Sequence, residues 1–573
     1  MNRIREASVT VGLALFFAAC SSSSTDTPAS GGNGSTPSNT SGASNTGNTS
    51  GASSTGNTSG ASSTGNASGA GNTGNMSGAG NSGGAGNSAG SASTTAGSTT
   101  GGAAPTAGTG NMPTAGTAGT GGGGPVTPVV LPDVVTSTNG AFWKTGTLTP
   151  VTSGTADVSA DDNSKKQRWD GFGGTFNEAG WDAMSVLSAA DKAKVISLLF
   201  SAADGANFAY GRLPIGASDY AMKRYTLAET KDDYTMSSFT IAQDKKMLIP
   251  FIQAAVAVKP ELHLWASPWT PPAWMKDNNS TDDGNMKDTD QVLTAFALYL
   301  EKFVQAYAAE GLKIEAVHPQ NEPGYKNPYP SCGWSSATYI KFIRDYLGPL
   351  FTKDNIPAEI WCGTMSAEGD ASIATSLAAD ANAMKYVKGF GLQWNTMSAV
   401  GSLKSKGAVM QTEHRCGNYS FTSPHATSTY DANKPQNDFA YGVESWLNIK
   451  DWVDAGVNSY SAWNMVLDTL GTNLNASKPW HQNALLVIDR NAKTLTATPA
   501  YYVFRHLSQF VAPKANVIGV SGGSALAFQN PDGAIVVVMY NSGAAKQAIV
   551  SLGGSKFQFD MPANGWATVH HAK

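Results

Sequence analysis

Residues 314–323 read IEAVHPQNEP, a short apolar run that ends in polar residues and a proline. Seven further runs of this β-type occur in the chain, and helical patterns lie between most of them. Such alternation is typical of a parallel α/β architecture. The eight runs span 168–176, 207–215, 262–269, 314–320, 359–363, 389–394, 409–413 and 459–465. Eight strand-and-helix units predict a (β/α)8 barrel, that is, a TIM barrel of the α/β class.

The intervening segments carry helical signals. Ser188 is a predicted N-cap for a helix whose apolar stripe contains Ile196, Leu199 and Phe200. Two later stripes have the same spacing: Ala295, Phe296, Leu300, Phe303 and Tyr307, and then Tyr339, Phe342, Ile343 and Tyr346.

The two ends of the chain differ from this pattern. From about residue 516 the sequence changes to short strands such as 534–540 with turns such as NPDG at 530–533, which predicts an antiparallel β-sandwich side domain. Strands near the start of the structured region complete it. We therefore expect N-terminal side-domain strands at 136–166, the catalytic barrel at 167–512 and the C-terminal β-sandwich at 513–573.

The first 135 residues have no globular pattern. Arg3 and Arg5 precede an apolar core that ends in Ala18-Ala19-Cys20, which predicts a lipoprotein signal peptide (1–20) and a lipid anchor on Cys20. An ordinary signal peptide that is cleaved near Ala19 is the alternative. Residues 21–135 are rich in Gly, Ser, Thr and Asn with a nine-residue period, which predicts a disordered tether. We expect an exported protein that is lipid-anchored to the bacterial outer membrane or cell surface.

Charge and cysteine content exclude several classes of partner. The formal net charge of −4 gives no reason to expect nucleic acid. Only Cys332, Cys362 and Cys416 remain after Cys20, so at most one disulfide forms, with Cys332–Cys416 as a candidate; buried free thiols are the favoured state. The cysteines lack metal-ligand spacing, and GFGG at 171–174 lacks the spacing of a phosphate-binding loop. We expect neither a metal nor a cofactor.

The ends of the predicted strands carry the candidate functional side chains, because function in such barrels lies at the C-terminal ends of the strands. Carboxylates, an arginine, asparagine and tryptophans together are typical of a sugar-binding site. The candidates are Arg212, Asp219, Trp269, Asn321, Glu322, Trp394, Glu413 and Trp463.

Two glutamates stand out among them. Glu322 follows the fourth strand in Asn-Glu-Pro, and Glu413 ends the seventh strand in Thr-Glu-His. Hydrolysis of a glycosidic bond requires one carboxyl group that protonates the leaving oxygen and a second that attacks or assists at the anomeric carbon. A lone glutamate is more often solvated or salt-bridged, but two at strand ends predict a glycosidase.

The sequence resembles glycoside hydrolase family 30 from about residue 140 onward, a family that includes acid β-glucosidases (glucosylceramidases) and endo-β-1,6-glucanases. The similar strings are GFGG at 171–174, RLP at 212–214, ASPWTPPAWMK at 266–276, QNEP at 320–323, TE at 412–413 and SAWN at 461–464. The resemblance implies a barrel with a β-sandwich side domain.

The resemblance also implies roles for these residues. Glu322 would be the acid/base and Glu413 the nucleophile of a retaining mechanism. Arg212 and Asn321 would keep the nucleophile ionised and contact the sugar 2-hydroxyl. The terminal sugar would lie against Asp219, Trp269 and Trp463. Arg212 should keep the pKa of Glu413 low, and burial should raise the pKa of Glu322.

One string departs from the family. Relatives carry His-Trp-Tyr where this chain has Gln393-Trp394-Asn395, and that tyrosine hydrogen-bonds the nucleophile. We expect His414 or Tyr325 to take its place, and the choice between them stays open.

The substrate that we expect is a β-linked glucoside, oligosaccharide or polysaccharide, with glucosylceramidase-like or endo-β-1,6-glucanase-like action. A xylanase or glucuronoxylanase of the same family is the first alternative, and it is disfavoured because 466–480 contains only Lys478 as a basic residue. A non-catalytic, tethered carbohydrate-binding lipoprotein is the alternative from another class.

Overall fold

The computed structural model describes residues 129–419, 430–474 and 481–572. The predicted signal peptide, Cys20 and the tether up to residue 128 lie outside the described residues, and so does Lys478. In these three ranges no helix combines the length and the apolar character that crossing a membrane requires.

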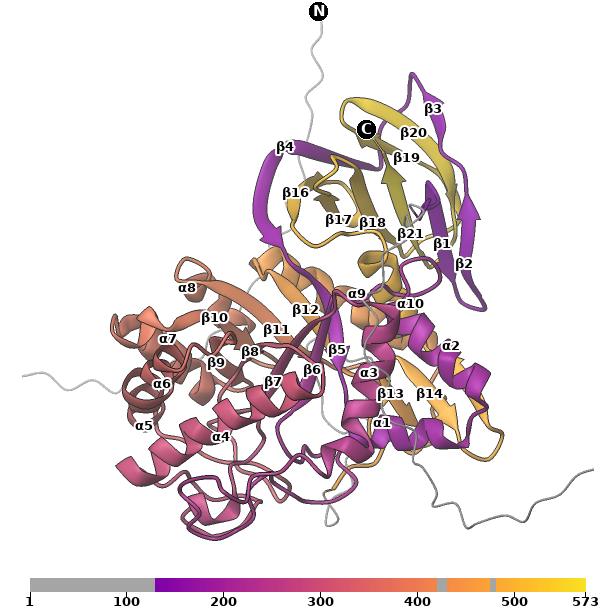
Figure 1. Ribbon diagram of the computed structural model, residues 1–573. Helices are drawn as coiled ribbons and strands as arrows, with labels where there is room; N and C mark the ends of the chain where they lie inside the picture. Colours follow the sequence, from indigo (N-terminus) through magenta and orange to yellow (C-terminus); the bar gives the residue numbers. More distant parts are fainter. Residues whose placement is uncertain (1–128, 420–429, 475–480, 573) are drawn as a thin grey trace, which may run out of the picture. The chain divides into compact units, whose positions relative to one another are not determined.

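Eight parallel strands close into a barrel in the order β10-β11-β12-β5-β6-β7-β8-β9, which confirms the predicted fold class (Figure 1). The first and last residues of each strand lie within three positions of the boundaries that the sequence predicted. The strands are β5 (Gly171–Thr175), β6 (Tyr210–Pro214), β7 (His263–Ser267), β8 (Ile314–Val317), β9 (Glu359–Met365), β10 (Val387–Leu392), β11 (Ala408–His414) and β12 (Ser459–Asn464). Sequence neighbours pair in register along the barrel, and β12 pairs with β5 to close it.

Glycine in β5 permits a close approach between strands. A Cβ atom on Gly173 would lie 2.3 Å from the backbone oxygen of Tyr210 on β6. No other residue type fits there without moving the strand, because real side chains do not approach backbone this closely. The GFGG string is thus explained by packing and not by phosphate binding.

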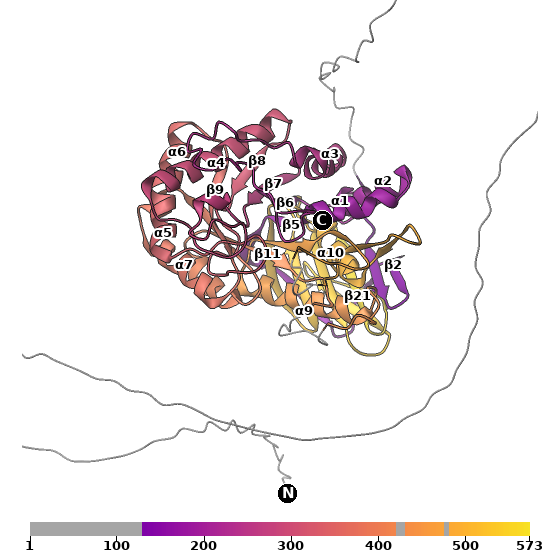
Figure 2. The same ribbon diagram turned by 90° about the horizontal axis from the view of Figure 1, so that it is seen from below.

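Helices surround the barrel, and α3 to α7 form an outer arc around its strands (Figure 2). The predicted N-cap is confirmed, since the Ser188 side chain accepts a hydrogen bond from the Asp191 N–H at the start of α2. The third predicted stripe is interrupted by a π-helical turn over Phe342–Leu347. The α-helices are α1 (Glu178–Ala183), α2 (Ala189–Phe200), α3 (Leu248–Val258), α4 (Asp290–Ala309), α5 (Ser336–Lys341), α6 (Gly348–Lys353), α7 (Glu368–Ala379), α8 (Val400–Leu403), α9 (Phe439–Ala455) and α10 (Pro499–Ser508).

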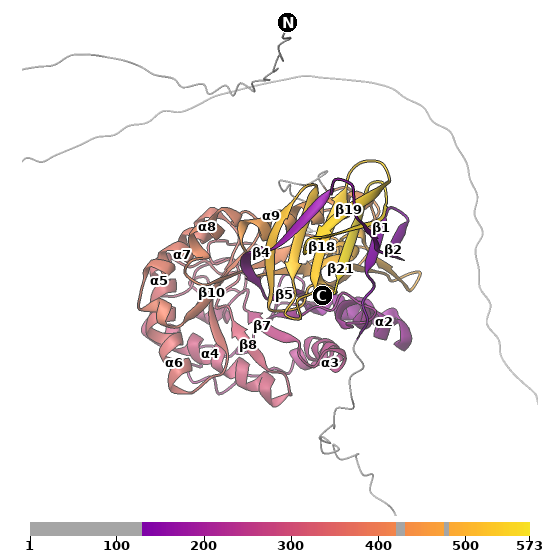
Figure 3. The ribbon, with the colours of Figure 1, turned by 90° about the horizontal axis from the view of Figure 1, so that it is seen from above.

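A ten-stranded sheet forms the side domain from both ends of the described chain. The indigo strands β1–β4 lie beside the yellow strands β16–β21 (Figures 1 and 3). A separate small sheet follows β12 and contains β13 (Val466–Asp468), β14 (Leu486–Asp489) and β15 (Thr494–Ala497). The side-domain strands are β1 (Val134–Thr138), β2 (Ala141–Gly146), β3 (Thr149–Val151), β4 (Val158–Trp169), β16 (Ala515–Ser521), β17 (Ser524–Gln529), β18 (Ile535–Asn541), β19 (Lys546–Leu552), β20 (Ser555–Met561) and β21 (Gly565–His571).

The three cysteines of the described residues are buried free thiols. The candidate disulfide between Cys332 and Cys416 is therefore absent, and the favoured alternative of free thiols is confirmed. Burial raises the pKa of the Cys332 thiol to about 12, so this group stays protonated.

Candidate active site

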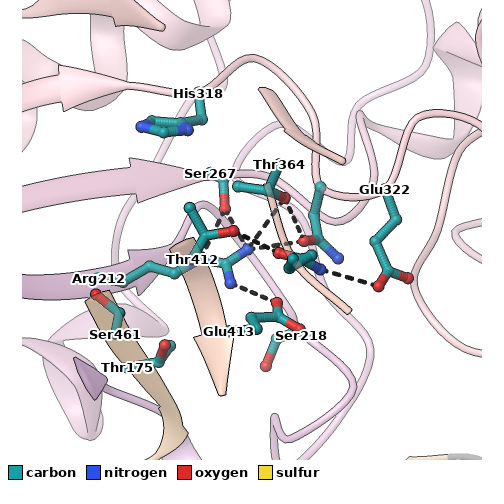
Figure 4. A network of polar contacts seen from close by, with 12 residues as sticks. Thr175, Arg212, Ser218, Ser267, His318, Glu322, Thr364, Thr412, Glu413 and Ser461 are labelled. Carbon is teal, nitrogen blue, oxygen red and sulfur yellow. Dashed lines mark hydrogen bonds and ion pairs between the residues drawn. The ribbon is translucent and has the colours of Figure 1, made fainter. Parts of the chain in front are cut away.

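Glu413 lies at the carboxyl end of β11, where two side chains hold its carboxylate. The Arg212 guanidinium on β6 forms a buried ion pair with Glu413 Oε1 (Figure 4). The Trp394 indole Nε1 donates a hydrogen bond to Glu413 Oε2 at 3.0 Å. Each carboxylate oxygen thus has its own donor, and the side chain is held in one orientation.

Arg212 is itself fixed by residues from the neighbouring strands. Its Nη2 group donates to Asn321 Oδ1 at 2.7 Å and to Ser267 Oγ at 3.0 Å. The same Asn321 oxygen accepts a second hydrogen bond from Thr364 Oγ1 at 2.6 Å (Figure 4). Because Oδ1 is occupied, the Asn321 amide nitrogen is the group left to donate to a ligand.

Trp269 and Trp463 pack against this arginine. Their rings are stacked with centroids 5.2 Å apart, and the Arg212 Cζ lies 4.5 Å from the Trp269 ring centroid. Both rings are buried, so the cation is held in a dry aromatic layer where its attraction for Glu413 is only weakly screened.

Glu322 follows β8 in a strained backbone conformation. Its φ angle of 48° lies in the left-handed region, which a non-glycine residue adopts at a cost, and Pro323 comes next. The backbone N–H of Glu322 donates to the Thr364 carbonyl oxygen at 2.9 Å, which holds this turn against the end of β9. The Gln393 side-chain amide donates to Glu322 Oε1 at 3.0 Å.

The two carboxyl groups differ in charge environment. Burial raises the pKa of Glu322 well above its usual value, and the neighbouring charge of Glu413 raises it further. Burial also raises the pKa of Glu413, although Arg212 opposes this effect. The expectation of a low pKa for Glu413 was therefore wrong, because desolvation outweighs the arginine. The pKa of Glu322 is still the more strongly raised of the two. Arg212 stabilises the Glu413 carboxylate, and Glu322 is the group that keeps a proton.

Asp219 is a third buried acid near this pair. Burial raises its pKa to about 7, with a further contribution from the charge of Glu413. One of its carboxyl oxygens, Oδ1, has no hydrogen-bond partner among the described residues. Arg212 lowers the pKa of Asp219 to a smaller extent. All eight predicted site residues thus lie in or beside one network at the carboxyl end of the barrel.

Neither expected substitute for the family tyrosine hydrogen-bonds Glu413 in the described part of the chain. His414 Nδ1 hydrogen-bonds the Tyr460 hydroxyl at 2.6 Å, and its Nε2 bonds the Ser445 hydroxyl at 2.9 Å. Tyr325 is 47% exposed. The Trp394 indole, which this chain shares with the family string, donates to Glu413 Oε2, and its backbone φ of 47° lies in the left-handed region.

Sequence reasoning missed the small polar residues that support the site. Ser267, Thr364 and Gln393 contact predicted residues, and Thr412 hydrogen-bonds Gln393. Gln393 was visible in the sequence as a departure from the family string, but its contact with Glu322 was not. The other three stand at strand ends, and only the closed barrel shows which way they point.

Family models match both domains of the chain. The glycosyl hydrolase family 30 TIM-barrel domain matches residues 169–511, and the family 30 β-sandwich domain matches residues 514–569. The chain belongs to glycosyl hydrolase family 30. It is an enzyme that hydrolyses β-glycosides, as the sequence predicted.

Relatives of this family 30 enzyme carry two kinds of name. A putative glucosylceramidase of Caenorhabditis elegans is 27% identical over 413 residues, which cover 68% of this chain and 77% of that protein. An endo-1,6-β-D-glucanase of Aspergillus fumigatus is 26% identical over 432 residues, which cover 69% and 83%. A solved endo-β1,6-glucanase superposes with a TM-score of 0.68 at 23% identity and shows the same fold; the likeness covers 77% of this chain and 99% of that one.

Proposed function

We propose that the enzyme hydrolyses β-glucosidic bonds by double displacement, with Glu413 as nucleophile and Glu322 as acid/base. The observation that carries this proposal is the asymmetry of the pair: Arg212 forms an ion pair with Glu413, whereas no cation contacts the Glu322 carboxyl among the described residues. One carboxyl is thus prepared to attack and the other to donate a proton.

The reaction follows from these assignments. In the first step Glu413 attacks the anomeric carbon while Glu322 gives its proton to the leaving oxygen, which forms a covalent glycosyl-enzyme. In the second step the Glu322 carboxylate takes a proton from water, and the resulting attack on the anomeric carbon releases Glu413. For this outcome we expect carboxyl groups about 5–5.5 Å apart. The free Asn321 amide nitrogen is suited to bind the sugar 2-hydroxyl.

A glucosyl unit is the substrate element that we favour. The named relatives are glucosylceramidases and endo-1,6-β-glucanases, both of which act on β-linked glucose. Glucuronoxylan recognition would need a basic pocket near the eighth strand, and residues 466–480 contain a single basic residue, Lys478. Asp219, Trp269, Trp394 and Trp463 are the side chains that we assign to the sugar subsite.

Cell-surface location is the second part of the proposal. The N-terminal sequence has the basic region, the apolar core and the Cys20 of a lipoprotein signal, and a long low-complexity segment follows it. A lipid on Cys20 would place the hydrolase outside the cell, where polymeric β-glucans are accessible. Labelling with radioactive palmitate, with Cys20→Ala as control, tests the anchor.

Product analysis tests the enzymatic proposal. Wild type is incubated with a β-1,6-glucan, xylan and glucosylceramide, beside Glu413→Gln. We expect glucose-containing products from the glucan or the ceramide, retention of the anomeric configuration by NMR, and a loss of kcat of about 10⁴-fold or more in the variant. Xylan-derived products would favour the xylanase alternative. Binding without products would favour the carbohydrate-binding lipoprotein, and equal rates in the variant would overturn the assignment of Glu413.

A further inference from the structure

The structure assigns Gln393 as the positioning residue of the acid/base, an inference that rests on the proposed roles of the two glutamates. Its amide nitrogen donates to Glu322 Oε1 at 3.0 Å, and its carbonyl oxygen accepts a hydrogen bond from Thr412, the residue that precedes Glu413. A primary amide has donor N–H groups on one side and an acceptor oxygen on the other. A single side chain therefore connects the Glu322 carboxyl group to the strand that carries Glu413.

The orientation of this amide is set by Thr412. The Thr412 hydroxyl donates to Gln393 Oε1 at 2.7 Å, so the carbonyl end of the amide faces Thr412 and the nitrogen faces the Glu322 carboxyl group. Thr412 directly precedes Glu413 on β11. The acid/base is thus tied, through one amide, to the strand that carries the nucleophile.

Glu322 depends on Gln393 more than Glu413 does. Among the described residues, Gln393 is the one side chain that hydrogen-bonds the Glu322 carboxyl. The Glu413 carboxylate is instead held by Arg212 and Trp394. Loss of Gln393 should therefore leave the nucleophile in place and free the acid/base to rotate.

The contact also selects the oxygen that carries the proton. Because Gln393 donates to Oε1, the acidic hydrogen of neutral Glu322 resides on Oε2, and Oε2 is the atom that protonates the leaving oxygen. After that transfer the carboxylate keeps the Gln393 hydrogen bond, which is stronger to an ionised acceptor. The same bond then holds the carboxylate while it takes a proton from water.

The test compares leaving groups in Gln393→Met, which keeps the length of the side chain and removes the amide. The kcat/KM for phenyl β-glucoside, whose leaving group needs a proton, should fall about 30-fold or more. The kcat/KM for 2,4-dinitrophenyl β-glucoside, whose leaving group departs without one, should fall less than about threefold. The basic limb of the pH profile should move to higher pH, because a hydrogen bond to the carboxylate lowers its pKa.

Two further variants make the result decisive. Thr412→Val removes the orienting hydroxyl and should show the same leaving-group dependence to a smaller degree, which tests the inference even if Gln393→Met does not fold. Gln509→Met is the matched control. This buried glutamine caps the C-terminus of α10 and donates to the Ala202 and Ala203 carbonyls, far along the chain from the site, so its substitution should change the rates on both substrates equally.

An equal loss on both glucosides in Gln393→Met and Thr412→Val would overturn the inference, as would an unmoved pH profile. A wild type that is inactive on every β-glucoside would instead refute the proposed function, so the two failures are distinguishable.

Discussion

Both ends of the barrel contain carboxylates and basic side chains. At the amino end these groups are paired and partly exposed, whereas at the carboxyl end they are buried. At the amino mouth a cavity of about 690 Å³ is lined by residues from the starts of the strands. Its carboxylates have partners and contact solvent: Glu315 lies 3.0 Å from Lys313 and 2.5 Å from His263. At the carboxyl mouth Glu322, Glu413 and Asp219 share one cation, Arg212, and are largely removed from water.

The Trp265 ring contacts both environments. Trp265 lines the amino-mouth cavity, and its ring centroid lies 5.1 Å from the Arg212 Cζ. The contrast teaches that carboxylates alone do not make an active site. Exposed, paired acids stay ionised and contribute little, whereas buried acids that outnumber their cations have divergent pKa values and can perform acid and nucleophilic chemistry.

After Glu413→Gln, the largest effect is expected from Glu322, the acid that no cation contacts among the described residues. Glu322→Gln should lower kcat/KM for glucosides with poor leaving groups about 10²- to 10⁴-fold, because general acid catalysis is lost. Activated aryl glucosides should react nearly normally in the first step, and azide should accelerate release of the glycosyl-enzyme. A uniform loss on all leaving groups, without azide rescue, would remove Glu322 from the acid/base role.

The second prediction concerns Arg212, the cation that pairs with Glu413. Arg212→Lys keeps a positive charge but loses the planar group that bonds Glu413, Asn321 and Ser267 together, so we expect kcat/KM to fall about 10²-fold. Since Arg212 lowers the pKa of Glu413, that pKa should rise and the acidic limb of the kcat/KM profile should move to higher pH. An unchanged acidic limb would contradict the ion pair's role.

Asp219→Asn tests how much the buried, ionised Asp219 lowers the free energy of unfolding. The folded-state pKa of Asp219 is raised to about 7, so the folded state binds this proton more tightly than the unfolded state does. Wild-type stability should therefore decrease as pH rises from about 4 to 7, by at most about 1.4 kcal/mol per pH unit from this group. The neutral variant lacks this loss. In denaturant titrations its free energy of unfolding, relative to that of wild type, should therefore increase between pH 4 and pH 7. Parallel curves at pH 4 and pH 7 would contradict the raised pKa.

The smallest effect is expected at the amino mouth. Glu315→Gln removes a partly exposed acid from its contacts with Lys313 and His263, and exposed pairs contribute about 0–1 kcal/mol. We expect kcat/KM within twofold of wild type and a small change in Tm. A large loss of activity would show that the two mouths are coupled through the Trp265 layer.

Much of this organisation was predictable from the sequence. The eight strands, the α2 cap at Ser188 and the two glutamates follow from local patterns, because strand ends in a parallel barrel converge on one mouth wherever the helices lie. The expected low pKa of Glu413 failed for a physical reason: the sequence shows Arg212 but not the burial that opposes it.

Periodicity and motif spacing therefore determined the barrel, the order of its strands and the identity of the paired acids. Only the tertiary structure decided how those acids are held: that Trp394 donates to Glu413 and that Gln393 reaches Glu322. These contacts join residues from different strands through particular side-chain orientations and left-handed backbone angles. Such geometry depends on the closure of the whole barrel, and no local stretch of sequence encodes it.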